Sequence, residues 1–270
     1  LVSHNPFKKY FFDNIERLNL VKESVNSIDG VRVKLLPDKV MVVDYAYEND
    51  IGILIRGVRN FGDYDTEKML RDVNVGIQNG IETIFLSSDS KLAHISSTAV
   101  KELYKYSGFV HEYVPLCVKE KMEANNNRFV IGVTGNIASG KNWLCKNLCS
   151  QMWCEHIDLD ELGHNILFKS DLLIHQKVRK EIRHNFDIKS LDVNGSSILS
   201  ETERTNLGNI VFGDSDKRDL LNSIMYQPIL TELRKSISAL EGIILLNGAL
   251  LVEFGLTHIC NNNVIVVTTN

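Results

Sequence analysis

The residues with the clearest chemical pattern lie in the middle of the chain, at Gly135-Asn-Ile-Ala-Ser-Gly-Lys141. This is the G-x-x-x-x-G-K spacing of a loop that surrounds phosphate groups with backbone N–H groups. Glycines let such a loop turn sharply and approach the anion closely, and Lys141 is predicted to reach the terminal phosphates. The alternative is a Gly-rich turn between a strand and a helix that binds no ligand.

The residue after the lysine departs from the usual pattern. That position is normally Ser or Thr, whose hydroxyl holds Mg²⁺, whereas this chain has Asn142. An amide oxygen can also ligate Mg²⁺, but its reach differs, and Mg²⁺ tolerates little departure from octahedral geometry. The substitution therefore predicts weakened metal-dependent nucleotide binding.

A pair of carboxylates, Asp158 and Asp160, follows the loop helix after a short predicted strand. Beside a phosphate loop, two such groups can hold Mg²⁺ through water and accept a proton from a hydroxyl. The alternative is a cluster of acidic residues that caps the next helix.

Basic and hydroxyl side chains recur in the first half of the chain. Lys8, Arg56 and Arg59 follow predicted strands, and Ser96-Ser97-Thr98 opens a predicted helix. Three cations and a hydroxyl-rich helix N-terminus at one sheet edge are typical of an anion site. The alternative is that the cations are solvated loop charges.

Strands that alternate with helices must position these residues. The pattern predicts strands near residues 31–36, 51–55, 83–86, 129–133 and 264–268, and helices near 13–26, 40–49, 63–78, 96–106 and 143–152. Such alternation is typical of parallel sheets with helices on both faces, which bind ligands at the carboxyl ends of their strands.

The length, net charge, apolar runs and cysteine spacing of the chain limit the class of protein. The 270 residues carry a net charge of −4, which argues against a general nucleic-acid-binding surface, and no apolar run is long enough to span a membrane. The five cysteines form no C-x-x-C pair, so we expect reduced thiols and a cytoplasmic location. The chain begins without Met and stops after a predicted strand, which suggests a fragment at both ends.

The first half resembles phosphopantetheine adenylyltransferases of the bacterial type, through Asn5-Pro-Phe-Lys-Lys9, Leu54-Ile-Arg-Gly-Val-Arg59 and Ile95-Ser-Ser-Thr-Ala-Val-Lys-Glu102. The family's opening strand and T/H-x-G-H motif are expected upstream of Leu1. The resemblance implies that Lys8 and Arg56 bind the phosphate of 4′-phosphopantetheine and that Val42 lines its pocket. It assigns ATP to Gly57, Val58, Arg59, Glu67, Leu92, Ala93, His94, Ile95, Ser96, Ser97 and Thr98.

The second half resembles dephospho-CoA kinases, through the phosphate loop, Ile157-Asp-Leu-Asp-Glu-Leu-Gly-His164, Glu203-Arg204 and Leu250-Leu-Val-Glu253. The resemblance implies that Asp160 is the base for the ribose 3′-hydroxyl, that Lys141 stabilises the transferred phosphoryl group, and that Asp158 and Arg204 hold the substrate. It assigns ATP to Gly135, Asn136, Ile137, Ala138, Ser139, Gly140, Lys141 and Asn142, and Mg²⁺ to Asn142 and Asp158. Asn142, Asn247 and Gln227 depart from the family's common residues.

Together these observations predict an α/β protein with a nucleotidyltransferase Rossmann-like parallel sheet at 1–120, a linker at 121–128 and a P-loop kinase three-layer α/β domain at 129–270. The predicted function is the last two steps of coenzyme A biosynthesis, with ATP and Mg²⁺, small-molecule substrates, no nucleic acid or membrane partner, and homo-oligomer formation left open. The alternatives are an enzyme with one active half, or a regulatory protein that binds nucleotide or CoA without turnover.

Overall fold

A computed structural model describes residues 1–77, 81–136, 138–188 and 198–268 of the chain. The chain divides into two compact units, each of which is described by itself. Unit 1 contains Leu1–Tyr106 and Glu112–Val118, and unit 2 contains Ser107–His111 and Lys119–Asn270. The segment predicted to be a linker, 121–128, forms the second half of helix α5 (Leu116–Asn125) and the first residue of strand β3 (Arg128–Gly135).

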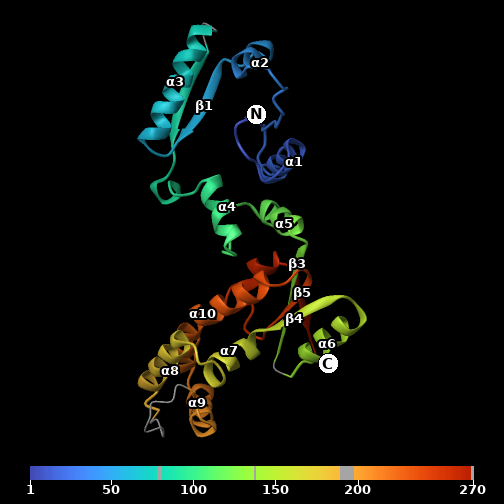
Figure 1. The fold of residues 1–270 in the computed structure, drawn as a ribbon, viewed down its shortest axis with the longest axis vertical. Coiled ribbons are helices and arrows are strands. Elements are labelled where there is room, and N and C mark those ends of the chain that lie inside the picture. The colour runs from blue at the N-terminus through green and yellow to red at the C-terminus, as the bar shows by residue number, and fades with distance from the viewer. Residues whose placement is uncertain (78–80, 137, 189–197, 269–270) are drawn as a thin grey trace. The chain divides into compact units, whose positions relative to one another are not determined.

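Unit 1 is built on two parallel strands, β1 (Ile53–Val58) and β2 (Glu82–Ser87), with the register Ile53↔Glu82 to Val58↔Ser87. Helix α3 (Phe61–Ile77) connects them and lies along the strand pair (Figure 1). This strand–helix–strand unit confirms the predicted parallel arrangement, because parallel neighbours need a crossover connection of this kind. The remaining elements of unit 1 are α1 (Asn14–Ser24), α2 (Val42–Glu48), the short η1 (Ser90–Leu92) and α4 (Ser97–Lys105).

Local sequence explains where the helices of unit 1 begin. Asp13 accepts a hydrogen bond from the backbone N–H of Glu16, whose side chain accepts one from the N–H of Asp13, so α1 opens with a complete capping box. Ser96 caps α4 by accepting from the N–H of Ala99 at 3.1 Å. Both helix starts agree with the sequence-based prediction.

The strand predicted at residues 31–36 is wrong. Only Leu35 pairs, through an isolated parallel bridge with Val2. The N–H of Val2 donates to the carbonyl of Lys34, and the N–H of Leu36 donates to the carbonyl of Val2, both at 2.8 Å. The following residue, Pro37, has no N–H to continue a ladder, so a β-rich segment makes one bridge and no strand.

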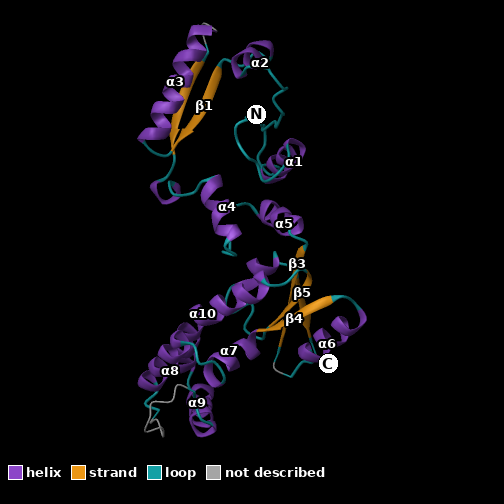
Figure 2. Cartoon of the chain, viewed as in Figure 1, coloured by secondary structure: helices purple, strands orange, loops and turns teal. Residues whose placement is uncertain are grey.

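Unit 2 contains a four-stranded parallel sheet in the order β4-β5-β3-β6, where β4 is Cys154–Asp158, β5 is Gly242–Asn247 and β6 is Val264–Val267. Figure 2 shows this sheet with helices around it. Successive side chains along each strand point to opposite faces of the sheet, and each face has its own hydrophobic core. Val133 and Leu245 pack with Cys145 of α6 (Lys141–Gln151), whereas Val130, Ile244 and Leu246 belong to the larger core on the opposite face.

The larger core is formed by helices α7 (Leu159–Phe168), α8 (Leu173–Asn185), α9 (Glu201–Gly213) and α10 (Ser215–Ser238), together with η2 (Leu256–Cys260). Helical side chains therefore cover both faces of the sheet, which gives the predicted three-layer α/β arrangement. None of the helices in the described ranges combines the length and hydropathy that a membrane crossing requires.

The cysteines differ from the expectation of five reduced thiols. Cys149, near the end of α6, and Cys154, the first residue of β4, form a disulfide. The short turn between helix and strand brings their Cα atoms to 4.9 Å, which is within disulfide range although the spacing is not C-x-x-C. Cys145 and Cys260 are buried free cysteines, and burial raises the pKa of the Cys145 thiol to about 11.

Candidate active sites

The phosphate loop of unit 2 begins where β3 ends. Gly135 has φ 146°, and a Cβ placed there would meet the backbone carbonyl of Val267 in the neighbouring strand. Any residue with a side chain at position 135 would therefore clash with β6 unless that strand moved. Gly140, at φ 90°, precedes the first turn of α6, so the chain turns in a left-handed conformation that glycine adopts easily. Ile137, which the resemblance to dephospho-CoA kinases assigned to ATP, lies outside the described residues.

Lys141 lies folded back over this loop. Its Nζ donates to the carbonyls of Gly135 and Asn136, each at 2.8 Å, and the residue is only 7% exposed. An ammonium group has three N–H donors, so one remains after these two bonds. The lysine is thus already positioned and largely shielded from water at the loop that the sequence predicted to bind phosphate.

Asp158 has two structural tasks at the end of β4. Its Oδ1 accepts from the backbone N–H groups of Asp160 at 2.9 Å and Glu161 at 3.3 Å, and so caps helix α7. Its Oδ2 accepts from Nδ2 of Asn142 at 2.9 Å. The capping role that the sequence left as an alternative is real, but it uses one carboxylate oxygen, and the other faces the loop helix.

Asp160 follows in the first turn of α7 with an exposed surface. Its carboxyl pKa is raised, first because the surrounding protein displaces water and then because of the negative charge of Asp158, while the Lys141 ammonium lowers it. A carboxylate with a raised pKa is a stronger base than an ordinary aspartate once it is ionised. The arrangement is suited to accepting a proton from a hydroxyl group.

Asn247, which the sequence marks only as a departure from the family's common residue, lies beside the predicted site. It is the last residue of β5, is 1% exposed, and pairs in register with Val133 on one side and Asp158 on the other. Its Nδ2 donates to Oδ1 of Asn142 and lies 3.5 Å from Oδ2 of Asp158. The signal that was available is its position at the carboxyl end of a central strand.

Arg204, predicted to hold the CoA-like substrate, lies in the first turn of α9. Its guanidinium stands over the Phe168 ring at 5.3 Å, and its Nη1 lies 3.7 Å from a carboxylate oxygen of Glu201. It keeps an exposed side chain, and its described contacts are with these residues and not with the phosphate loop.

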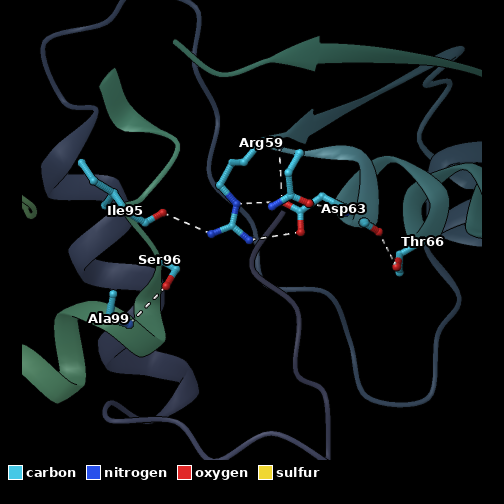
Figure 3. A network of polar contacts seen from close by, with 8 residues as sticks. Arg59, Asp63, Thr66, Ile95, Ser96 and Ala99 are labelled. Carbon is cyan, nitrogen blue, oxygen red and sulfur yellow. Dashed lines mark hydrogen bonds and ion pairs between the residues drawn. The ribbon is translucent and has the colours of Figure 1, made fainter. Parts of the chain in front are cut away.

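In unit 1 the structure brings several of the predicted residues together. Nε of Arg56, inside β1, lies 3.5 Å from Oε2 of Glu67 in α3. Arg59, just after β1, donates from Nε and Nη2 to the two oxygens of Asp63, at 2.7 and 3.2 Å, and from Nη1 to the carbonyl of Ile95 at 3.1 Å (Figure 3). The hydrogen bond from Arg59 lowers the pKa of the Asp63 carboxyl.

Arg59 thus joins the end of β1 to the segment that starts α4. Gly57 and Val58 are the last residues of β1, and Ser97 and Thr98 form the first turn of α4 behind its cap, Ser96. Leu92 ends η1 and Ala93 follows it, while the ring of His94 meets that of Tyr113 edge-on at 5.9 Å. Apart from Glu67 in α3, the residues of unit 1 that were predicted to bind ATP therefore lie in two segments that the Arg59 guanidinium links.

Two further predicted residues of unit 1 occupy separate elements. Lys8 is exposed in the loop before α1, where its backbone N–H donates to the carbonyl of Asn5 at 3.0 Å. Val42 is the first residue of α2. Their assignment to the acceptor substrate stays a prediction.

Comparisons with known proteins assign both halves. The family model for dephospho-CoA kinase matches residues 129–270. The curated phosphopantetheine adenylyltransferase of Psychromonas ingrahamii is 35% identical over 121 residues, which cover 45% of this chain and 74% of that protein. The Hamiltonella defensa protein of the same name is also 35% identical, covering 45% and 76%, and that of Mannheimia succiniciproducens is 36% identical, covering 42% and 70%.

Both matches are extensive enough to establish the family, and the adenylyltransferase relatives correspond to the first half of the chain. They do not favour an enzyme with one active half or a non-catalytic binding protein. The chain therefore belongs to the dephospho-CoA kinase family and, through its first half, to the phosphopantetheine adenylyltransferase family, and it joins two ATP-using transferases of the last two steps of coenzyme A biosynthesis.

Proposed function

We propose that the phosphate loop of unit 2 holds the triphosphate of ATP while its γ-phosphoryl group passes to the ribose 3′-hydroxyl of dephospho-CoA. The observation that carries this assignment is the position of Lys141, whose buried ammonium is fixed on the carbonyls of Gly135 and Asn136 and keeps one N–H for a ligand. Binding phosphate there costs little reorganisation, since the cation is already in place. The backbone of Asn136, Ala138, Ser139 and Gly140 completes the loop.

Asp160 is proposed as the general base. The ribose oxygen attacks the γ-phosphorus, the bond to the bridging oxygen of ADP breaks, and the hydroxyl proton moves to the Asp160 carboxylate. A base is most useful when its pKa approaches the working pH, and desolvation and the charge of Asp158 both raise that of Asp160. Arg204, exposed on α9, is proposed to hold the CoA-like substrate together with Asp158.

Mg²⁺ is proposed as the metal of the kinase site. Asp158 offers a carboxylate oxygen and Asn142 an amide oxygen, which are ligand types that Mg²⁺ takes, but in this structure Asn142 Nδ2 donates to Asp158 Oδ2 at 2.9 Å and Asn142 Oδ1 accepts from Asn247 Nδ2. The Asn142 amide would have to turn before its oxygen could share an ion with Asp158. When bound, the ion neutralises charge that develops on the transferred phosphoryl group. Asn142 and Asp158 would hold it.

Unit 1 is proposed to catalyse adenylyl transfer. A phosphate oxygen of 4′-phosphopantetheine attacks the α-phosphorus of ATP, and the bond to the β-phosphate breaks, which releases pyrophosphate. Positioning and charge neutralisation carry such a step, and no protein nucleophile is needed. Lys8 and Arg56 are proposed to hold the acceptor phosphate beside Val42, and the segments at 57–59 and 92–98, with Glu67, are proposed to hold ATP.

The proposed partners are the small-molecule substrates 4′-phosphopantetheine, dephospho-CoA and ATP, with no nucleic acid or membrane surface. We also propose a cytoplasmic location and keep homo-oligomer formation open.

The test of the kinase assignment is Asp160→Asn in the whole protein. Loss of the base should reduce 3′-phosphorylation by roughly 10²–10⁴-fold while ATP binding and dephospho-CoA formation are retained. Glu161→Gln is the matched control, since it removes a neighbouring carboxylate from the same helical turn. The acid limb of the wild-type kcat/KM profile should lie above the ordinary pKa of aspartate, because Asp160 must be ionised to act and its pKa is raised. Equal loss in both variants would contradict the assignment.

A further inference from the structure

The bridge between Cys149 and Cys154 lies at the end of the kinase sheet opposite the phosphate loop. Cys149 is near the C-terminal end of α6, which begins at Lys141, and Cys154 begins β4, which ends at Asp158. The hydrogen bond from Asn142 to Asp158 joins the same helix to the same strand at their other ends. The helix that carries the phosphate-loop lysine is therefore tied to this strand at two places, and one of the ties is a bond that thiols can break.

A cavity of about 580 Å³ opens beside the bridge, at the edge of the sheet where the strands begin. Both cysteines line the cavity and are half-buried, and the turn between them carries Trp153, which is fully exposed. Pockets of this size hold small molecules. The bridge is therefore accessible to a compound of low molecular weight.

The charges around this cavity select among such compounds. Glu155 and Glu241 line it and are exposed, and no Lys or Arg is among the described residues of its lining. Arg128, the first residue of β3, directs its guanidinium to the carbonyls of Ser238 and Leu240, at 3.4 and 3.3 Å. Carboxylates attract cations and repel anions. A compound should therefore enter the cavity with a neutral or cationic end.

A structural role explains this bridge poorly. Its cysteines are five positions apart, and the stabilisation by a disulfide grows with the length of the loop that it closes. The helix and the sheet also pack through a core that includes Val133, Cys145 and Leu245. In the proposed cytoplasmic location thiol buffers keep most cysteines reduced, and the bridges that do form there are usually transient and serve catalysis or redox sensing.

We propose that Cys149–Cys154 is a thiol–disulfide exchange site for a low-molecular-weight thiol whose reactive end is neutral or cationic, and that opening the bridge lowers the kinase activity. The exchange stands on the bridge and its cavity alone, whereas the effect on activity rests on the proposed kinase function. Once the bridge is open, α6 is aligned with β4 only by packing and by the hydrogen bond from Asn142. Lys141 and Asp158 are then held less exactly, and small displacements of catalytic groups lower reaction rates.

The exchange is balanced without any further oxidant or reductant. The thiolate of the small molecule attacks the sulfur of one cysteine, a new S–S bond forms there, and the Cys149–Cys154 bond breaks. The electron pair of the broken bond leaves on the other cysteine, which takes up a proton. A second small thiol then attacks the mixed disulfide, which releases the small molecule as its own disulfide and leaves two protein thiols.

The other cysteines of unit 2 do not compete for the bridge. Cys145 lies one helical turn before Cys149, but it is buried, and burial raises the pKa of its thiol to about 11. Cys260 is also buried, and burial raises the pKa of its thiol as well. Because the thiolate is the attacking form, both stay unreactive, and the pair has one closed state and one open state.

The first test measures the exchange itself. The whole protein is equilibrated with reduced and oxidised glutathione at a series of ratios, free thiols are alkylated, and the peptides are weighed by mass spectrometry. The bridge should open within the ratios that the cytoplasm holds, and Cys154→Ser should trap glutathione on Cys149 while Cys145 and Cys260 remain unmodified. A bridge that stays closed until dithiothreitol is added would overturn the proposal.

The second test identifies the thiol. The reduced protein is treated with cystamine, oxidised glutathione or CoA disulfide, and each rate is divided by that of a free cysteine peptide. Cystamine, which is cationic, should have a relative rate roughly two- to fivefold above that of oxidised glutathione, which is anionic. Glu155→Gln with Glu241→Gln should remove this preference, whereas Glu120→Gln with Glu181→Gln, which changes the net charge equally outside the cavity, should keep it.

Equal relative rates of cystamine and oxidised glutathione in the wild-type protein would overturn the cavity as the entrance. CoA disulfide separates two sources of the same chemistry. A relative rate above that of glutathione identifies the pantetheine thiol of the enzyme's own product as the preferred partner, and a lower rate identifies the glutathione pool.

The third test measures activity with S-methylated substrates, because their own thiols would otherwise open the bridge. Opening should lower kcat/KM for 3′-phosphorylation by roughly threefold or more and leave adenylyl transfer unchanged, since the bridge lies in unit 2. Cys149→Ser with Cys154→Ser, with its fold checked by thermal unfolding, should match the open form and no longer respond to thiols. Equal activity of the open and closed forms, or a double variant that still responds, would overturn the effect on activity. A protein that exchanges thiols but phosphorylates in neither form would contradict the proposed kinase function instead.

Discussion

Replacement of Lys141 by Met isolates the contribution of one ammonium group to the kinase step. The lysine stem is buried and Met has a similar unbranched shape, so Lys141→Met keeps the packing and removes the charge. The two carbonyls that Nζ contacts belong to Gly135 and Asn136. Because Asn136 is exposed, water can replace the ammonium there, and we expect a stability loss of only about 1 kcal/mol.

The loss in catalysis should be larger. Two of the three N–H groups of Lys141 are used within the loop, so one charge-assisted hydrogen bond to phosphate is lost, at about 1.5–3 kcal/mol. Each 1.36 kcal/mol corresponds to a factor of ten, which predicts a decrease in kcat/KM for 3′-phosphorylation of roughly 10- to 150-fold. The acid limb of the pH profile should also move upward, because the Lys141 ammonium lowers the pKa of Asp160 and its removal raises that pKa further.

The assay follows CoA formation from dephospho-CoA, and dephospho-CoA formation from 4′-phosphopantetheine serves as the internal reference. Lys146→Met is the matched control, since Lys146 lies in the same helix, carries the same charge and is exposed. Lys146→Met should change both activities less than twofold. The reasoning would be refuted by a loss below threefold in Lys141→Met, by an equal loss in both reactions of a folded protein, or by an equal effect of the two lysines.

Three further predictions concern other parts of the chain. Arg56→Ala should lower kcat/KM for 4′-phosphopantetheine by an amount equivalent to about 2–3 kcal/mol, because a charge-assisted contact to the acceptor phosphate is lost. Arg71→Ala is the control, since the Arg71 guanidinium pairs with Asp72 on α3, and similar losses in the two variants would contradict the assignment of Arg56. Lys119 is 2% exposed and its Nζ lies 2.7 Å from Oε1 of Glu123, so Lys119→Met should destabilise the protein by about 3–5 kcal/mol in urea unfolding. Lys119→Met with Glu123→Leu should recover only part of this loss, because it removes the unpaired carboxylate but leaves the buried Asn261 amide without either partner, and a double variant as unstable as the single one would count against this. Burial lowers the pKa of His175 from 6.5, although the negative charge of Glu232 at 3.6 Å opposes this shift. The folded state therefore resists protonation of His175, so the free energy of unfolding should be greatest above pH 6.5 and should decrease as the pH falls below it. His175→Gln should flatten this pH dependence in urea titrations, and an unchanged slope would refute the prediction.

Much of the local structure could be predicted because it depends on neighbouring residues. The phosphate loop is specified by glycines and a lysine within seven positions, and the starts of α1 and α4 by Asp13 with Glu16 and by Ser96. The alternation of strands and helices gave the parallel sheets. In each case the physical cause is backbone freedom, helix capping or periodicity. Each of these acts over a few consecutive residues, so it can be recognised directly in the sequence.

The predictions that failed depended on a partner distant in sequence or on how a turn closes. Residues 31–36 have strand propensity, but among the described residues they make only the bridge between Leu35 and Val2. Cys149 and Cys154 pair because the turn after α6 brings their Cα atoms to 4.9 Å, a distance that their spacing does not reveal.

The sequence by itself determined the α/β class, the phosphate loop and the identity of Lys141, Asp158 and Asp160 as candidates for chemistry. Only the tertiary structure decided that Asn247 contacts Asn142 across 105 positions of sequence, that one oxygen of Asp158 caps a helix while the other faces the loop, and that Lys119, Glu123 and Asn261 form a buried polar cluster. The reason is physical. Hydrogen bonds and ion pairs of this kind depend on which strand ends lie side by side, and strand order is fixed by the packing of the whole sheet and not by any segment within it.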